Sequence, residues 1–402
     1  MSAIAITGVG IVCAAGLDFE TFGDSLIAGR TAVTDFPLTR LAGSRRTQAA
    51  HIKQLNNLES FSSRDLAGCD RFSVLALLAA EQAVTAAKLD PDLIAGTRTA
   101  VVVGTGVGGA TTIDDGHHAL YVDGGRLHPF TIARLMPSAA ASQISRQWGC
   151  RGTVFAVTSA CASAAQAIGV GMGMLRAGQA DRVIVGGSEA SLTPSGVRSW
   201  EAMRVLTDTK CRPFSCDRDG MVLGEGAAIF VLEDMSAARH RGAPIVASLL
   251  GYGTSSDAKD LVRPDPVGAA LAMQFALQDA GLVGQDIGHV NAHGTGTLLN
   301  DAAEATALEM VFGHQLADLP VSATKPIHGH TLGAAGAIEL AASIVALRAK
   351  AAPATLNLTA VDPDSRLRVS AERQDIERSV AMSNSFAFGG INAALIVADA
   401  DW

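Results

Sequence analysis

Short apolar runs recur along the chain, separated by stretches rich in Gly and Ala. Runs rich in β-branched residues predict buried strands at 3–6, 100–103, 154–157, 182–185, 227–232, 288–291, 379–382 and 393–397. The composition between them predicts helices, among them 81–89, 166–177 and 270–282. Strands that alternate with helices in this way are typical of α/β architecture.

The pattern repeats weakly within the chain. The helix predicted at 81–89 leads to strand 99–103 and Gly104-Thr-Gly106, and the helix at 270–282 leads to strand 288–291 and Gly294-Thr-Gly296. The helices expected after Cys161 and after His330 also share an Ala-Ile pair and a Leu-Arg-Ala triplet, at an offset of roughly 170 to 190 residues. We therefore expect two similar halves, residues 1–240 and 241–402, with the active site between them.

Length and charge narrow the class of protein. A chain of 402 residues exceeds one small core, which agrees with two fused halves. Hydrophobic residues make up 48% and charged residues only 17%, so we expect a tightly packed interior. The formal net charge of −8 leaves no basic excess to neutralise phosphates, which argues against nucleic-acid binding.

Cysteine usage and the apolar segments bear on location. The six Cys include no CxxC pair and suit neither a disulfide framework nor a zinc site, so free thiols in a reducing compartment are expected. The amino terminus lacks the basic region of a signal peptide, and no apolar run reaches the roughly 18 residues that a membrane span needs. We expect a cytoplasmic protein without a membrane span.

Cys161 lies where the strand predicted at 154–157 gives way to small residues and then to a helix. A thiol in the first turn of a helix faces unpaired N–H groups and the positive end of the helix dipole, which favour the thiolate. The alternative interpretation is a small Cys that packs between strand and helix. The rest of the chain decides between the two.

Two histidines in the second half occupy Gly-rich turns that follow predicted strands. They are His293, followed by Gly-Thr-Gly-Thr297, and His330, flanked by glycine and followed by Thr-Leu-Gly. Glycine lets the backbone approach a ligand closely, so these histidines and Cys161 form a candidate catalytic set. His328 could pair with His330 on a metal, but no carboxylate or Cys stands at ligand spacing beside them, so no metal is expected.

The run from Gly104 to Gly109 formally matches the GxGxxG dinucleotide fingerprint. No second strand with a terminal acidic residue follows at the required spacing. We expect a turn that serves packing or a substrate channel, and no nucleotide cofactor.

Four motifs occur in order: Thr158-Ser-Ala-Cys161-Ala-Ser-Ala, His293-Gly-Thr-Gly-Thr297, Lys325 with Gly-His330-Thr-Leu-Gly-Ala-Ala-Gly, and Asn384-Ser-Phe-Ala-Phe388-Gly-Gly. Together with the block Arg212–Gly226 they resemble the elongating β-ketoacyl-acyl carrier protein synthases of the thiolase superfamily, essentially end to end. The resemblance implies a thiolase-like five-layer αβαβα fold of two duplicated halves. It also implies an acyltransferase that performs a decarboxylative Claisen condensation in fatty-acid or polyketide/polyene biosynthesis.

The same resemblance assigns the chemistry. Cys161 would carry the acyl chain as a thioester, and the backbone N–H groups of Cys161 and Phe388 would form the oxyanion hole. His293 and His330 would donate hydrogen bonds to the malonyl thioester and stabilise the enolate left when CO₂ departs. Phe388 would also act as a gate between the acyl and malonyl steps.

Supporting roles follow from the resemblance as well. Lys325 and Glu304 would form a buried charge pair that holds the His330 loop. Thr295 and Thr297 would bind the amides of the pantetheine arm. The substrates travel on the phosphopantetheine of a carrier protein, so no separate cofactor is expected.

Chain length would depend on an acyl tunnel, for which Val107, Leu135 and Trp200 are the candidates. Trp200 could equally be a core or interface aromatic. The family's dimer places residues near Leu135 in the partner's tunnel. The expected partners are therefore an acyl carrier protein and either a second copy of the chain or a related chain-length-factor subunit.

Some positions depart from the family pattern. Leu298 stands where Pro is usual, and Ile391-Asn-Ala replaces Thr-Asn-Gly. The segment around Arg64 is also poor in basic residues, whereas acidic carrier proteins require a local positive surface. The candidates for that surface are Arg45, Arg46, Arg64 and Arg71, and ordinary solvated arginines are an equal interpretation.

Two alternative functions accompany the main hypothesis of a condensing enzyme. The chain could be a ketosynthase subunit that is active only with a chain-length-factor-like partner. A degradative thiolase, which uses coenzyme A thioesters and a second Cys, is disfavoured because the motif Asn384–Asn392 has Phe and no Cys.

Overall fold

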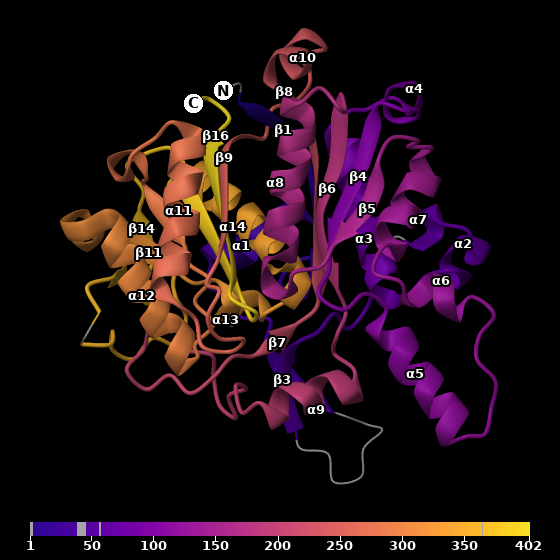
Figure 1. Cartoon of the computed structure of the whole chain (residues 1–402), viewed down its shortest axis with the longest axis horizontal. Coiled ribbons are helices and arrows are strands. Elements are labelled where there is room, and N and C mark those ends of the chain that lie inside the picture. Colours follow the sequence, from indigo (N-terminus) through magenta and orange to yellow (C-terminus); the bar gives the residue numbers. More distant parts are fainter. Residues whose placement is uncertain (1–2, 38–45, 56–57, 364) are drawn as a thin grey trace.

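A computed structural model describes residues 3–37, 46–55, 58–363 and 365–402 (Figure 1). Its strands are β1 (Ile4–Cys13), β2 (Thr34–Pro37), β3 (Arg46–Ala50), β4 (Thr99–Gly104), β5 (Val154–Val157), β6 (Arg182–Glu189), β7 (Leu223–Gly224), β8 (Gly226–Asp234), β9 (Ala247–Ser256), β10 (His289–Asn291), β11 (Pro320–Ser322), β12 (Ala351–Ala352), β13 (Arg368–Val369), β14 (Gln374–Asp375), β15 (Val380–Ala387) and β16 (Ile391–Asp399).

The helices connect these strands. They are α1 (Phe19–Ile27), α2 (Ser63–Ala67), α3 (Arg71–Ala86), α4 (Pro91–Ile94), α5 (Ala110–Tyr121), α6 (Thr131–Leu135), α7 (Ala139–Trp148), α8 (Ser163–Arg176), α9 (Pro194–Ala202), α10 (Met235–His240), α11 (Pro266–Ala280), α12 (Leu298–Phe312), α13 (Lys325–His328) and α14 (Ala335–Ala349). Two 3₁₀ turns matter for the site, η2 (Ala160–Ala162) before α8 and η5 (Leu332–Ala334) before α14.

The main sheet contains the same strand order twice. It runs β13-β11-β10-β15-β16-β9-β1-β8-β6-β4-β5. Read outward from its middle, β1-β8-β6-β4-β5 in one half corresponds to β9-β16-β15-β10-β11 in the other. The halves join where β1 and β9 pair antiparallel, from Ile4–Leu249 to Ile6–Ala247. The expected α/β architecture of two duplicated halves is confirmed.

Helices cover both faces of each half and so produce the layers. In the first half α3 and α7 pack on one face of the sheet, and in the second half α11 and α12 do so. Between the halves, α8 and α14 share one apolar core with β1, β6 and β16 (Figure 1). This arrangement is the five-layer αβαβα fold that the resemblance implied.

Helix α14 is buried on every side, because it lies in the central layer. Every residue from Ala335 to Leu347 is buried, as expected for a helix enclosed by protein. The helical stretch Leu332–Ala349 is long and apolar enough to cross a membrane, contrary to the expectation that no segment qualifies, but 89% of it is buried inside the protein. Its composition therefore reflects its place in the core.

Candidate active site

Cys161 occupies a sharp turn between β5 and α8. Ala160, which precedes it, has a positive φ of 49°, a conformation that a residue with a Cβ adopts only under local constraint. The Cys161 side chain is 4% exposed. Burial raises the pKa of its thiol to about 12, although the Lys325 charge lowers it. Desolvation of the buried thiol thus opposes the thiolate that the helix N-terminus was expected to favour.

His293 and His330 meet Cys161 at the same point. The sulfur of Cys161 and one ring nitrogen of each histidine all lie within 4.8 Å of one another. The two rings are 5.3 Å apart and nearly perpendicular. Burial and the Lys325 charge hold the pKa of both histidines well below 6.5, so both are neutral at pH 7. A neutral imidazole can accept the thiol proton or donate an N–H to a substrate carbonyl.

Lys325 organises this cluster from the interior. Its ammonium forms an ion pair with Glu339 and donates to the His293 carbonyl oxygen. It also lies 3.3 Å from His293 Nδ1. The charge pair expected between Lys325 and Glu304 is wrong, because the Glu304 carboxylate instead accepts the backbone N–H groups of His293 and Gly294, each at 2.8 Å. Glu304 thus holds the His293 turn directly.

His328 has no free ring nitrogen with which to share a metal ion with His330. His328 uses both ring nitrogens, with Thr324 Oγ1 and the Gly329 carbonyl oxygen each 2.8 Å away. In the Cys161, His293 and His330 cluster, the Lys325 ammonium faces Nδ1 of His293, which leaves the proton on the nitrogen that faces the cavity. That cation would also repel a metal ion.

The cluster lies at the base of a cavity of about 300 Å³. Thr295 and Thr297, expected to bind pantetheine, line this cavity, and their hydroxyl oxygens are 2.9 Å apart. Phe388 lines it as well. The exposed apolar residues at its rim are Met203, Leu261, Val262, Leu298 and Leu299, and the charged ones include Arg204 and Arg263.

The three tunnel candidates are placed differently. Trp200 of α9 is half-buried, stacks on Phe388 with ring centroids 5.8 Å apart, and packs against the apolar cluster that contains Cys161. Val107 is 48% exposed, and half-buried Leu135 lies next to its turn, where Gly109 donates to the Leu135 carbonyl oxygen. Within one chain the structure thus brings Trp200 to the cluster and groups the other two elsewhere.

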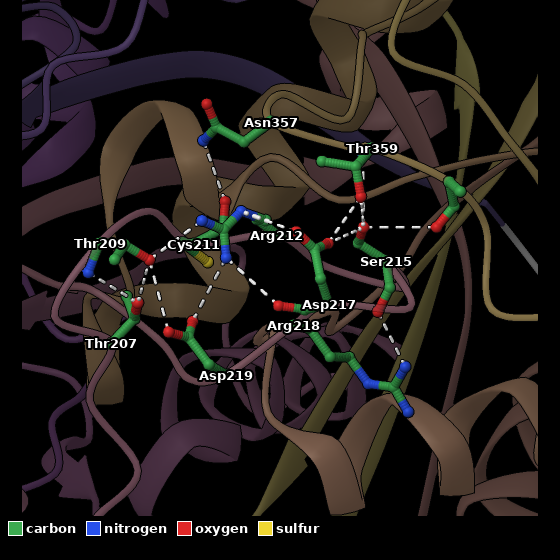
Figure 2. A network of polar contacts seen from close by, with 11 residues as sticks. Thr207, Thr209, Cys211, Arg212, Ser215, Asp217, Arg218, Asp219, Asn357 and Thr359 are labelled. Carbon is green, nitrogen blue, oxygen red and sulfur yellow. Dashed lines mark hydrogen bonds and ion pairs between the residues drawn. The ribbon is translucent and has the colours of Figure 1, made fainter.

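A polar network reaches the cavity through Asp219 (Figure 2). Arg212 donates to Thr209 Oγ1 and to the Asp217 carbonyl oxygen, and lies 3.7 Å from Asp219, which lines the cavity. Cys211 Sγ donates to the Thr295 carbonyl oxygen at 3.3 Å and so links the network to the candidate pantetheine site. The sequence marked this block only as part of the resemblance.

The Gly104–Gly109 turn has a packing role. A Cβ at Gly104 would lie 2.4 Å from the Ala164 backbone nitrogen, so glycine lets β4 approach α8. The next glycine, Gly106, donates to the carboxylate of Glu189 at 2.6 Å. Glu189 is a fully buried acid that sequence reasoning missed, although an acidic residue at the end of an apolar strand was a visible signal.

The four arginines expected to form the carrier-docking surface differ in their surroundings. Arg71 is an internal contact, because its guanidinium pairs with Glu225 at 2.6 Å and donates to the Ile52 carbonyl oxygen, so it is not a free surface charge. Arg64 is exposed on α2. Arg45 lies outside the described residues, and for Arg46 only the backbone, in β3, is described.

The fold and the Cys–His–His cluster define a condensing enzyme of the thiolase fold. Family models agree along the chain: "Beta-ketoacyl synthase, N-terminal domain" matches residues 1–238 and "Beta-ketoacyl synthase, C-terminal domain" matches residues 246–359. The chain belongs to the β-ketoacyl synthase family and is an acyltransferase.

Relatives and solved structures match over nearly the whole length. "Nodulation protein E" of Rhizobium sp. (strain N33) is 42% identical over 98% of both chains. "3-oxoacyl-[acyl-carrier-protein] synthase 2" of Staphylococcus aureus (strain COL) is 36% identical over 98% of this chain and 97% of its own. The structure titled "The ishigamide ketosynthase/chain length factor" superposes with a TM-score of 0.93 at 30% identity and covers 99% of each chain.

Proposed function

We propose that the chain is a β-ketoacyl-acyl carrier protein synthase that extends a Cys161-bound acyl chain with malonyl-carrier protein. The observation that carries this proposal is the meeting of Cys161, His293 and His330 at the base of one cavity. A nucleophile beside two neutral imidazoles suits both thioester exchange and stabilisation of an enolate.

The first half-reaction loads the acyl chain. A neighbouring neutral imidazole takes the Cys161 proton, and the sulfur attacks the acyl thioester carbonyl. The backbone N–H groups of Cys161 and Phe388 stabilise the oxyanion. The carbon–sulfur bond to pantetheine then breaks, and the imidazolium returns its proton to the departing pantetheine thiolate. This proton relay compensates for a thiol whose pKa burial raises to about 12.

The second half-reaction forms the carbon–carbon bond. Malonyl thioester binds with its carbonyl oxygen toward the ring N–H groups of His293 and His330. The bond to the carboxylate breaks, CO₂ leaves, and its electron pair forms an enolate that these N–H groups stabilise. The enolate carbon attacks the Cys161 thioester, and the Cys161 thiolate leaves and is reprotonated from solvent.

The cavity suits an arm delivered by a carrier protein. Thr295 and Thr297 offer hydroxyl groups to the amides of pantetheine. At the rim, exposed Arg204 and Arg263 offer two positive charges to an acidic protein partner, beside exposed apolar side chains and two exposed acids, Asp219 and Asp260. We place carrier docking at this rim and retain exposed Arg64 as a further contact.

We propose that the working unit is a dimer. Strand β5 is the last strand of the sheet, and an unpaired edge is a template for a second chain. Nearby, the segment from α5 through α6, which projects from the body in Figure 1, exposes Leu120, Tyr121, Val122, Leu127, Phe130, Ile132 and Met136. An apolar patch of this kind marks an interface. Size-exclusion chromatography with light scattering should show a dimer that Ile132→Glu weakens.

The partner in that dimer is a second copy or a related subunit. The match to the ketosynthase/chain length factor structure favours a related subunit as the partner. The alternative function is then that of a ketosynthase active only with such a partner. Condensation by the isolated chain would exclude this alternative. All six cysteines are free thiols, which supports a cytoplasmic location.

Mass spectrometry tests the proposal. Incubation with acyl-carrier protein should add one acyl group to the peptide that contains Cys161. Cys161→Ala should abolish both the adduct and the condensation, and Cys150→Ala, which changes another buried Cys whose sulfur contacts the Ile94 carbonyl oxygen, should leave the adduct in place. Condensation by Cys161→Ala at the rate of the unmodified enzyme would refute the proposal.

A further inference from the structure

Glu189 is a buried acid that the proposed chemistry does not use. It is the last residue of β6 and is fully buried. Its carboxylate accepts Ser191 Oγ at 2.8 Å, Gly106 N at 2.6 Å and Gly333 N at 3.2 Å. All of these partners are neutral, so the carboxylate is held by oriented dipoles and not by an ion pair. Burial of a carboxylate without an ion pair costs free energy, so its presence here requires an explanation.

The hydrogen bonds of Glu189 join two loops that are far apart in sequence. Gly106 belongs to the turn after β4, and Gly333 belongs to η5, three residues after His330. A Cβ at Gly333 would lie 2.0 Å from Gly106 N and 2.6 Å from Glu189 Oε2. The two backbones therefore meet directly, with one carboxylate oxygen between their N–H groups.

This junction adjoins the nucleophile. Leu332, next to Gly333, has a positive φ of 46° and packs in the apolar cluster around Cys161. The Glu189 charge also reaches the thiol, because it raises the pKa of Cys161 while the Lys325 charge lowers it and Glu339 raises it further. Burial raises the pKa of Glu189 itself to about 7.

We propose that Glu189 is a positioning residue for the condensation: its carboxylate ties the Gly106 turn to the Gly333 turn and so fixes the Leu332 wall beside Cys161 and the loop that carries His330. The hydrogen bonds that join the two turns, called the tie below, matter more for this role than the negative charge. Since a charge next to Cys161 opposes thiolate formation, the hydrogen bonds from the two turns, and not the charge, account for a side chain of this length with an acceptor oxygen at this position.

Two substitutions separate the tie from the charge. Glu189→Gln removes the charge but can keep its carbonyl oxygen on both glycine N–H groups, with the amide group donating to Ser191 Oγ. Glu189→Asp keeps the charge but shortens the side chain by about 1.5 Å, so one oxygen can no longer reach both N–H groups.

Amide hydrogen exchange and steady-state kinetics distinguish the two variants. In Glu189→Asp, amide exchange in peptides that contain Gly106 and Gly333 should accelerate by about tenfold or more. Its kcat for condensation should fall by about tenfold with little change in KM for the carrier, because the docking rim is untouched. Glu189→Gln should stay within about threefold of the unmodified enzyme in both measurements.

Two outcomes would overturn the proposal. One is a Glu189→Asp variant as protected and as active as the unmodified enzyme. The other is a reversed order, with Glu189→Gln impaired and Glu189→Asp normal, which would assign the role to the charge.

Glu233→Gln is the matched control. It removes a buried carboxyl from β8 that bonds Arg182 and Arg241. In the β6–β8 pairing Glu233 faces Arg182, at the opposite end from Glu189, roughly 23 Å away at 3.3 Å per residue. This variant should lose stability without faster exchange at Gly106 or Gly333. The proposal rests on the proposed condensation, but exchange is measured without substrate, so a failure of condensation in the unmodified enzyme would refute that function alone.

Discussion

Lys325 and Glu339 form an ion pair inside the central layer of the protein, directly beneath the His293 turn. The two side chains are 1% and 0% exposed, so neither charge reaches water. Burial raises the pKa of Glu339 to about 7, and the Lys325 charge opposes that rise. The pair therefore keeps a fixed ammonium beside Nδ1 of His293, and this ammonium determines which ring nitrogen carries the proton.

Replacement of Lys325 should impair decarboxylation more than acyl loading. Lys325→Met removes the group that orients the His293 ring, so the N–H toward the malonyl carbonyl is lost. Decarboxylation should fall by about 10²–10³, as for loss of one oxyanion donor. Acyl transfer to Cys161 should fall by only about tenfold, since the His330 ring remains.

The two half-reactions can be measured separately, by CO₂ release and by mass of the Cys161 peptide. Lys259→Met, which removes an exposed Lys paired with Asp265, is the control and should change neither. Equal losses in both half-reactions of Lys325→Met would contradict this role.

Glu304→Gln should destabilise the fold as well as slow the enzyme. Glu304 accepts the His293 and Gly294 N–H groups on separate oxygens, and an amide leaves one of these buried N–H groups without an acceptor. The expected loss in the free energy of unfolding is about 1–3 kcal/mol, measured by urea titration. Glu309→Gln on the same helix, where the carboxylate is 43% exposed and pairs with Arg366, should change it by less than about 0.5 kcal/mol.

His289 should make stability depend on pH. It is buried against Ser322 Oγ, and burial lowers its pKa to about 3. Below pH 6.5 the unfolded chain binds a proton at this position that the folded chain does not. The contribution of His289 is therefore fully present above that pH and is lost as the pH falls toward 3.

Comparison with His289→Gln isolates this effect from the other titrating groups. The stability difference between the unmodified protein and the variant should shrink by about 1.4 kcal/mol per pH unit between pH 6 and 4.5. Parallel stability curves for the two proteins over that range would show that His289 does not titrate as expected.

Trp200 should control both the position of the Phe388 gate and the length of the acyl product. Its indole stacks on Phe388, so Trp200→Ala opens space beside the Cys161 cluster and loosens the Phe388 turn. We expect longer acyl products, resolved by chromatography of the released chains, and a loss of about 3–5 kcal/mol at most in stability. Trp200→Phe keeps an aromatic partner and should retain the original product range. An unchanged distribution in Trp200→Ala would remove Trp200 from the tunnel.

The sequence identified eight of the strands, namely β1, β4, β5, β6, β8, β10, β15 and β16, and among those that it missed β9 has a clear physical reason. Gly251 and Gly253 lie in the middle of β9, which contains a single β-branched residue, Thr254, and so lacks the composition of a buried strand. A Cβ at these positions would lie 2.4 Å from the Ala276 oxygen and 2.1 Å from the Ala272 oxygen of α11. The glycines that obscured the strand are those that let the helix pack against it.

The reactive groups were predictable, and so were two supporting residues, Lys325 and Glu304, but the partners of these two were not. Cys161, His293 and His330 stand in local motifs, so short segments sufficed to find them. Glu339 stands in an Ala-rich helix whose every residue from Ala335 to Leu347 is buried, and nothing local marks its partner. Which acid reaches Lys325 depends on how α13 and α14 pack, and this packing is a property of the whole fold.

The turn that presents Cys161 has a twin. Ala160 opens η2 and Leu332 opens η5, both with positive φ, and each turn leads into a helix of the central layer. In that comparison Gly333 stands where Cys161 stands. Its N–H, the counterpart of an oxyanion donor, already binds the Glu189 carboxylate, and Gly106 occupies the space of a side chain. The duplicated fold therefore contains a second turn of the same kind, in which glycine replaces the cysteine and an internal carboxylate occupies the N–H group that would otherwise be open to a ligand.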